Sequence, residues 1–286
     1  MRELLRNEAV RERRGALRQR IRTAGFTVND ILCCEDRPAF VGPGYADGHT
    51  VVLVRSGAYL RQVEGEELFA DPTGGFLLRP GDEQRVAHPV GTGDRSTEIR
   101  LPEQLFADRF DGPAAARPFR VTGATDLHHR ALLAAARRGS EPFELTERLH
   151  HLLDAVAAST GRWSIDRPAR RSTAQAHGRL VRDTCAVLAG GPAALGLSLE
   201  ELARLVGASP HHLSRVFHAV TGTTLTRYRN ELRVRGVLYA IEEGADGLRA
   251  LAHRYGFADQ AHLTRTCRSH TGHVPSAVRG LLADRA

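Results

Sequence analysis

The spacing of apolar positions changes along the chain, from a strand-like period in the first part to a helical period in the rest. Short β-branched or apolar runs fall at residues 50–54, 58–63, 75–78 and 84–87, separated by turns that contain glycine or proline. Many short strands with regular turn signals are typical of a β-barrel or sandwich. From about residue 126 onward, apolar positions recur every three or four residues, as in amphipathic helices. The pattern therefore predicts a β region followed by helices.

The last third of the chain holds a helix-turn-helix pattern. A short helix at 199–206 keeps its apolar positions on one face, and Gly207 tolerates the positive φ of a turn. Ser209 followed by Pro210 is a strong start signal for a second helix. That second helix places apolar side chains on one face and polar ones on the other. The polar positions that we take as candidate DNA contacts are His211, His212, Ser214, Arg215 and His218.

A second unit repeats this pattern about fifty residues later. Leu248 and Leu251 begin an apolar stripe, Gly256 lies in the break between helices, and Asp259 is the expected N-cap of a helix at 260–271. The outward positions of this helix are Gln260, Ala261, His262, Thr264, Arg265 and Arg268.

Residues 225–241 between the two units read as one continuous helix that can act as a rigid spacer. An α-helix rises about 1.5 Å per residue, so this spacer can hold two recognition helices about 34 Å apart, one turn of B-DNA. We expect both helices to enter successive major grooves on one face of a duplex.

Residues 176–282 resemble the AraC/XylS family of bacterial transcription regulators. The resemblance rests on Leu199-x-x-Leu202-Ala203, Ser209-Pro210-x-x-Leu213-Ser214-Arg215-x-Phe217, Ala252-x-x-Tyr255-Gly256-Phe257-x-Asp259-Gln260-x-x-Leu263-Thr264-Arg265 and Gly272-x-x-Pro275. Members of the family use both recognition helices on DNA. The resemblance implies base contacts from His211, Ser214 and Arg215 and from Gln260, Ala261, His262 and Arg265, with Arg268 on a phosphate.

Each of these residues also has a purely structural interpretation. Arg215 and Arg265 would otherwise be solvated surface charges, but a guanidinium fork fits guanine or phosphate, and both lie in the first half of a recognition helix. His211 and His212 could equally be surface residues at a helix start, and His262 could cap or pack locally. For the histidines both interpretations stay open.

The charge distribution supports a DNA-binding C-terminal region. The 286-residue chain has 40 basic residues against 33 acidic ones, and every basic residue is arginine. Residues 162–286 carry 18 arginines and 10 acidic residues, a net +8, whereas residues 1–161 carry 22 and 23, a net −1, which together give the chain's +7. Positive charge is therefore concentrated where attraction to phosphates would be needed.

The fold class that we predict is multidomain α and β: an N-terminal cupin-like β-barrel with a helical hairpin, and a C-terminal all-α domain with tandem helix-turn-helix units. The order of strands and turns resembles the cupin-like sensor domain that many AraC/XylS regulators carry. The predicted segments are a charged helix at 1–25, the barrel at 26–122, helices at 123–161 that could dimerise or pack on the barrel, a linker at 162–175, and the DNA-binding domain at 176–286.

In regulators of the family that the chain resembles, the barrel holds a small effector or takes part in dimerisation, and the candidate pocket residues here are Arg55, Tyr59, Arg61 and His88. Structural roles are an alternative for each of them. We expect no metal and no cofactor. His49 and His88 are two isolated histidines, fewer than the three protein ligands of a catalytic site, and the adjacent Cys33 and Cys34 cannot present a Cys-x-x-Cys chelate.

These features favour a sequence-specific transcription regulator in the cytoplasm that performs no covalent chemistry. Double-stranded promoter DNA is the expected partner, with RNA polymerase, a small-molecule effector and a second copy of the chain as further candidates, and no membrane. A metal-dependent cupin enzyme with an appended DNA-binding domain is the alternative. A methyl-accepting DNA-repair protein is a third hypothesis, which the absence of a four-cysteine zinc cluster disfavours. The operator, the direction of regulation, the effector and the oligomeric state stay open.

Overall fold

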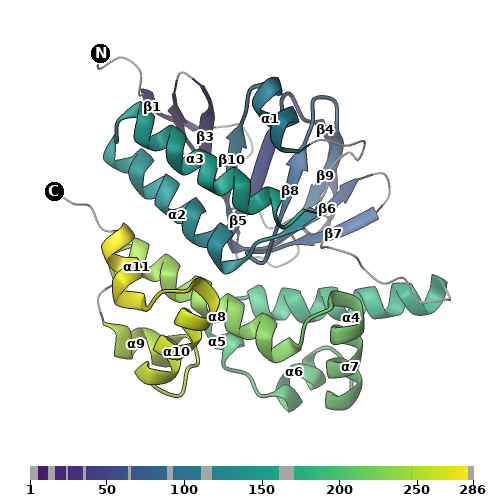
Figure 1. Ribbon diagram of the computed structural model, residues 1–286. Coiled ribbons are helices and arrows are strands. Elements are labelled where there is room, and N and C mark those ends of the chain that lie inside the picture. Colours follow the sequence, from purple (N-terminus) through teal and green to yellow (C-terminus); the bar gives the residue numbers. More distant parts are fainter. Residues whose placement is uncertain are drawn as a thin grey trace.

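The computed structural model has a β-rich N-terminal domain stacked on a helical C-terminal domain (Figure 1). This confirms the predicted fold class. The residues that the structure describes are 6–11, 17–23, 25–34, 37–63, 66–88, 93–110, 118–160, 171–245 and 247–282.

The strands of the N-terminal domain form two antiparallel sheets. The first sheet has the strand order β1-β2-β3-β10-β5-β8-β11, and the second has the order β4-β9-β6-β7. In the described residues the strands are thus arranged as two separate sheets and not as one closed barrel. The strands are β1 (Arg6–Arg11), β2 (Leu17–Arg22), β3 (Thr27–Cys33), β4 (Val41–Tyr45), β5 (Thr50–Gly57), β6 (Tyr59–Val63), β7 (Glu66–Ala70), β8 (Gly74–Leu78), β9 (Glu83–Ala87), β10 (Asp94–Arg100) and β11 (Pro118–Arg120).

The central strand β5 is buried on both faces. Val51 and Leu53 belong to a core shared with the helices, whereas Val52 and Val54 pack in the core that contains Tyr59 of the second sheet. Successive side chains of a strand point to opposite faces, so an unbroken apolar run is the expected signature of such a strand. Helices α1 (Glu103–Arg109), α2 (Gly123–Arg138) and α3 (Pro142–Ala157) contribute side chains to the first of these cores.

The prediction of a charged helix at residues 1–25 is wrong, because the described parts of this segment are the strands β1 and β2. They extend the seven-stranded sheet beyond β3, with Ile21 paired to Val28. Ile21 is only 5% exposed. The many arginines suggested a solvated helix, but hydrogen bonding to β3 and burial of this side chain favour the strand.

The C-terminal domain is entirely helical. Residues 162–170 of the predicted linker lie outside the described residues, and residues 171–175 form the start of α4 instead of a linker. The helices are α4 (Arg171–Ala189), α5 (Pro192–Leu195), α6 (Leu199–Leu205), α7 (Pro210–Thr221), α8 (Leu225–Glu242), α9 (Leu248–Arg254), α10 (Gln260–Thr271) and α11 (Pro275–Leu282). Among the described helices, none combines the length and the apolar character that a membrane crossing needs.

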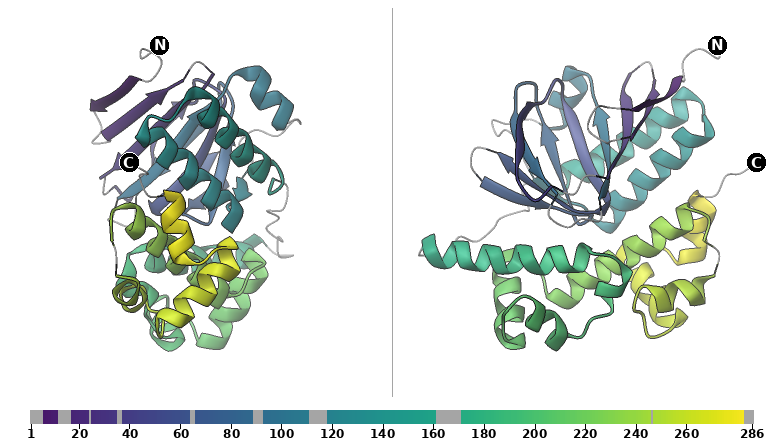
Figure 2. Two further views of the ribbon diagram at one scale, coloured as in Figure 1. Left: turned by 60° about the vertical axis from the view of Figure 1, so that its left-hand side comes forward. Right: turned by 180° about the vertical axis from the view of Figure 1, so that it is seen from behind.

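Helix α8 of the C-terminal domain packs against the N-terminal domain. Figure 2 shows the helical domain lying along one side of the β-rich domain, and the side chains at the boundary are buried and charged. Glu242 of α8 accepts hydrogen bonds from Arg55 of β5 and Arg130 of α2, each at 2.7 Å. Nearby, Arg120 of β11 pairs with Glu231 of α8 at 2.7 Å. These contacts fix α8 against the sheet and against α2.

Candidate functional site

Helix α7 is the second helix of the first helix-turn-helix unit, and its start follows from local capping. The Ser209 hydroxyl accepts a hydrogen bond from the His212 amide at 3.3 Å, and Pro210 occupies the first turn. Gly207 in the preceding turn has a φ of +67°, which an L side chain rarely adopts. Leu213 and Phe217 are fully buried, so the opposite face of α7 is directed outward.

Helix α10 occupies the same place in the second unit. The Asp259 carboxylate accepts a hydrogen bond from the His262 amide at 2.6 Å, and α10 covers the residues that the sequence predicted. Gly256 in the turn has a φ of +73°. Leu263 and Cys267 are fully buried, which leaves the positions between them on the surface.

The predicted DNA-contacting residues of the two helices lie mostly on the surface. Those that are exposed are His211, Arg215, His218, Gln260, Ala261, Arg265 and Arg268, and those that are half-buried are His212, Ser214, His262 and Thr264. Within the described part of the chain, no acidic side chain pairs with Arg215, Arg265 or Arg268. Arg215 and Arg265 each stand six positions after their N-cap residue, Ser209 and Asp259, so they occupy equivalent places.

Two of the predicted histidines have local partners. The imidazole of His262 packs edge-on against Phe257, with ring centroids 5.3 Å apart, and its Nδ1 accepts a hydrogen bond from the Ala258 amide at 3.3 Å. His212 lies 5.9 Å from the ring of His177 on α4. The contacts of His262 correspond to the local packing that the sequence left open as an alternative for this residue.

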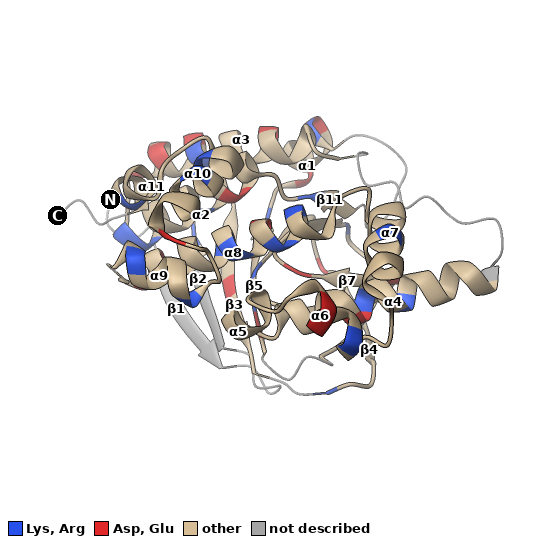
Figure 3. Ribbon diagram, turned by 90° about the horizontal axis from the view of Figure 1, so that it is seen from below, with Lys and Arg blue, Asp and Glu red and all other residues tan. Residues whose placement is uncertain are grey.

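The two units lie at opposite ends of α8 (Figure 1). Figure 3 shows the molecule from the side of the helical domain, where arginine positions lie on α7, α8 and α10. Arg229 and Arg233 of α8 donate to the backbone carbonyls of Leu197 and Leu195, respectively. These two arginines therefore hold the chain before α6 instead of facing a partner, whereas Arg215 and Arg265 are exposed.

Of the four predicted pocket residues, Arg55 is engaged in the domain boundary, where it pairs with Asp30 at 3.1 Å as well as with Glu242. Arg61 is 1% exposed and stacks over Phe76 at 4.1 Å. Burial lowers the pKa of Arg61.

The other two predicted pocket residues, Tyr59 and His88, lie side by side, with ring centroids 5.8 Å apart. Burial and the charge of Asp94 raise the pKa of Tyr59. A hollow of about 180 Å³ is lined by other residues, namely Arg22, Thr23, Thr27, Asn29 and Arg100.

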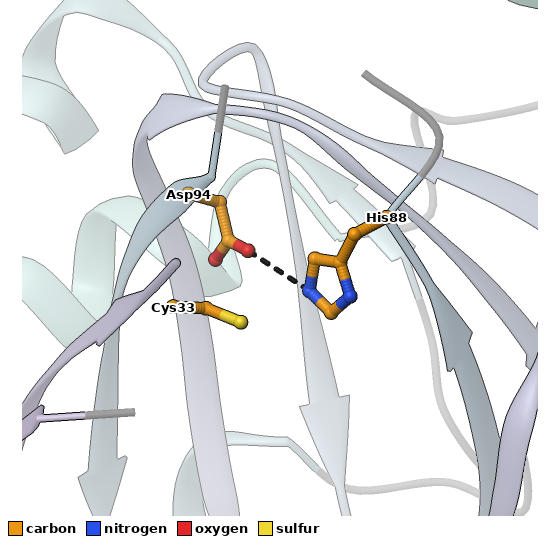
Figure 4. Close-up of side chains that lie close together, drawn as sticks. All are labelled: Cys33, His88 and Asp94. Carbon is orange, nitrogen blue, oxygen red and sulfur yellow. Dashed lines mark ion pairs between the residues drawn. The ribbon is translucent and has the colours of Figure 1, made fainter. Parts of the chain in front are cut away.

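His88 also has two partners that the sequence did not predict. Its Nε2 lies 3.1 Å from an oxygen of Asp94, and one donor atom from each of Cys33, His88 and Asp94 lies within 4.8 Å of the others (Figure 4). Hydrogen bonds to Asp94 and Cys33 raise the pKa of His88 to about 10. In the sequence His88 is isolated from Cys33, and the pairing of Cys33 with Asp94 across β3 and β10 has no local signal.

The tandem arrangement of capped, arginine-bearing helices defines a helix-turn-helix class of DNA-binding domain, and comparison with known proteins agrees. A family model described as a helix-turn-helix domain matches residues 202–280. The chain is 34% identical over 83 residues to the multiple antibiotic resistance protein MarA of Escherichia coli, which is 29% of this chain and 65% of MarA. It is 30% identical over 84 residues to the probable transcription factor PqrA of Proteus vulgaris, which is 29% of this chain and 69% of PqrA.

These matches confirm the family expected from the sequence motifs: the chain belongs to the AraC/XylS family of transcription regulators. The chain thus spans less than two thirds of the length of MarA. Among solved structures, ToxT of Vibrio cholerae aligns over 91% of this chain and 99% of its own, at 9% identity and a TM-score of 0.34.

Proposed function

We propose that this protein is a sequence-specific, DNA-binding transcription regulator of the bacterial cytoplasm that inserts α7 and α10 into successive major grooves of promoter DNA. The observation that carries the proposal is the equivalence of Arg215 and Arg265. Both lie six positions after an N-cap, on exposed faces, without an acidic partner in the described residues.

The chemistry of these side chains suits base recognition. A guanidinium donates two parallel hydrogen bonds to O6 and N7 of guanine, the commonest specific contact in the major groove. Arg268 follows Arg265 by three residues and is exposed too, so it lies on the same side of α10 and suits a phosphate. Phosphate contacts orient a protein on the duplex, whereas base contacts select the sequence.

The proposal is tested by selecting preferred sites from random duplexes with the full chain and then measuring the affinity of variants. Arg215→Ala should relax the preference at one base position and weaken the preferred site by about 1–3 kcal/mol. Arg265→Ala should act in the same way at a position in the other half-site. Arg85→Ala is the control, because Arg85 is a half-exposed arginine on β9 of the other domain, with 47% of its side chain accessible.

Loss of affinity without a change in base preference would indicate a phosphate contact instead of a base contact for that arginine. If neither variant differs from the control in affinity or in preference, the proposed role of α7 and α10 is wrong. Measuring each affinity at two salt concentrations separates the two kinds of contact, since removing one phosphate contact lowers the salt dependence by about one counterion.

The finer parts of the proposal concern the N-terminal domain. We assign to it the binding of a small-molecule effector and the formation of a homodimer through α3, and we expect RNA polymerase to be contacted at the promoter. The exposed Phe143 at the start of α3, with 82% of its surface accessible, supports the dimer, because large apolar side chains are rarely left so open. Sedimentation of Phe143→Ser as a monomer, under conditions where the unchanged chain is a dimer, would support this assignment.

A further inference from the structure

Three side chains with metal-binding donor atoms converge at the ends of three strands in the N-terminal domain. Cys33 is the last residue of β3, Asp94 is the first residue of β10, and His88 directly follows β9. Cys33 and Asp94 are paired neighbours in the seven-stranded sheet, whereas β9 belongs to the four-stranded sheet. The cluster therefore spans both sheets.

The donor atoms face one another. Figure 4 shows the Asp94 carboxylate and the Cys33 sulfur on the same side of the His88 ring, near the nitrogen that Asp94 contacts. The Nε2–Oδ1 distance is 3.1 Å, and no two of the three donor atoms are more than 4.8 Å apart. His88 and Asp94 are buried and Cys33 is half-buried. The three side chains are therefore held by the surrounding structure and do not move freely in solvent.

Hydrogen bonds around the cluster hold Asp94 and His88 in place. The Ser96 hydroxyl donates to Oδ2 of Asp94 at 2.8 Å, which turns the other carboxylate oxygen toward His88. That oxygen, Oδ1, is buried and lies 3.1 Å from Nε2 of His88. The backbone amide of His88 donates to the carbonyl of Arg37 at 2.6 Å. Outer contacts of this kind orient metal ligands in known sites.

We propose that Cys33, His88 and Asp94 form a binding site for a divalent transition-metal ion, with zinc as the best fit. A thiolate, an imidazole and a carboxylate are the three ligand types that zinc takes in proteins. Zinc bonds of about 2.0–2.3 Å in a tetrahedron separate ligand atoms by about 3.3–3.6 Å. The His88–Asp94 pair, at 3.1 Å, is near this spacing, and the other two donor pairs lie within 4.8 Å, so zinc binding requires the side chains to rotate and draw the three donors together.

Charge and coordination number fit as well. In the metal-free site, hydrogen bonds to Asp94 and Cys33 favour the protonated imidazole of His88, so zinc must displace that proton when it binds. In the zinc-bound site the thiolate and the carboxylate are ionised and the imidazole is neutral, so two negative charges balance Zn²⁺ where there is little solvent. Three protein ligands leave the fourth tetrahedral position to water. Because the ligands come from both sheets, the metal ties them together, and the metal-bound N-terminal domain is more stable than the metal-free one.

The experiment uses the untagged full chain, stripped with a chelator and reloaded with Zn²⁺ or Co²⁺ alone. Native mass spectrometry counts the bound zinc, and a sulfur-to-cobalt charge-transfer band in the visible spectrum reports thiolate ligation. We expect one metal per chain and a higher melting temperature with zinc. Cys33→Ser should abolish the band and weaken zinc binding by more than about 100-fold, since loss of an outer-shell partner alone costs 10–100-fold.

The neighbouring Cys34 provides a matched control, because it is exposed and lies one residue away. Cys34→Ser should keep the zinc, the cobalt band and the melting shift. Asp94→Asn preserves the size of the side chain and should weaken binding while circular dichroism shows an unchanged fold. If the unchanged chain binds no zinc at a roughly tenfold excess, or if binding survives both Cys33→Ser and Asp94→Asn, the site does not exist. Equal losses in Cys33→Ser and Cys34→Ser would also overturn the assignment.

Discussion

A close approach between the backbones of α2 and α10 predicts the effect of one added methyl group. Gly123 is the first residue of α2, and a Cβ built on it would lie 2.6 Å from the carbonyl carbon of His270 in α10 and closer still to its oxygen. These are backbone atoms that cannot rotate away. Carbon atoms in contact prefer separations of about 3.5–4.0 Å, so in Gly123→Ala the end of α10 must retreat by about 1 Å or more.

The free-energy cost follows from the same contact. Overpacking of this kind typically costs about 1–3 kcal/mol. The intrinsic preference of alanine over glycine in a helix opposes it by at most about 1 kcal/mol. This cost falls on the contact between α2 and α10. It raises by roughly 5- to 150-fold the population of chains in which the two helices are separated.

Hydrogen–deuterium exchange measured by mass spectrometry is the assay, because it reports local opening along the chain. Gly123→Ala should speed the exchange of amides at residues 268–273 and in the first turn of α2. Gly178→Ala in α4 is the control, since nothing lies within 4 Å of a Cβ at that position. Equal exchange at 268–273 in both variants would refute the idea that this contact positions α10.

Two further predictions concern buried charge at the domain boundary. Glu242→Gln should lower the free energy of unfolding by about 1.5–3 kcal/mol in urea titrations, because the buried Arg55 and Arg130 each lose one of their two carboxylate partners; Glu243→Gln, whose side chain is 49% exposed, should change it by less than about 1 kcal/mol. Burial lowers the pKa of His129 to about 3 and of His270 to about 4, so the unfolded chain takes up protons first as the pH falls below 6.5, and stability is lost toward pH 4. Each histidine should cost about 2 kcal/mol at pH 5 relative to pH 8, and urea titrations of His270→Gln should show a flatter pH dependence than those of the unchanged chain.

The helix-turn-helix units were predictable because their signals are local. A capping side chain, a glycine turn and an apolar stripe all lie within about a dozen residues of one another. Asp259 and Gly272 mark the two ends of α10, and the helix covers the predicted range. Ser209 marks the start of α7. Short-range capping and periodicity were therefore enough to predict most of the candidate DNA-binding surface.

Features that depend on distant parts of the chain could not be predicted in this way. Arg55 is a predicted pocket residue, but its hydrogen-bond partner Glu242 is 187 positions away. The meeting of Cys33 with Asp94 follows from strand register, which no local pattern encodes. The prediction of a helix at the N-terminus is wrong because β2 is stabilised by pairing with β3 and β1 by pairing with β2, and no pattern within either strand alone reports these pairings.

The dual use of α8 has a mechanical consequence. This eighteen-residue helix lies between the two recognition helices, α7 and α10. Through Glu231 and Glu242 it is also attached to the sheet and to α2. A tilt of α8 relative to the sheet would displace α7 and α10 together. Any signal that changes the shape of the β-rich domain can then change the angle at which α7 and α10 meet the duplex, while the distance between the two helices stays the same.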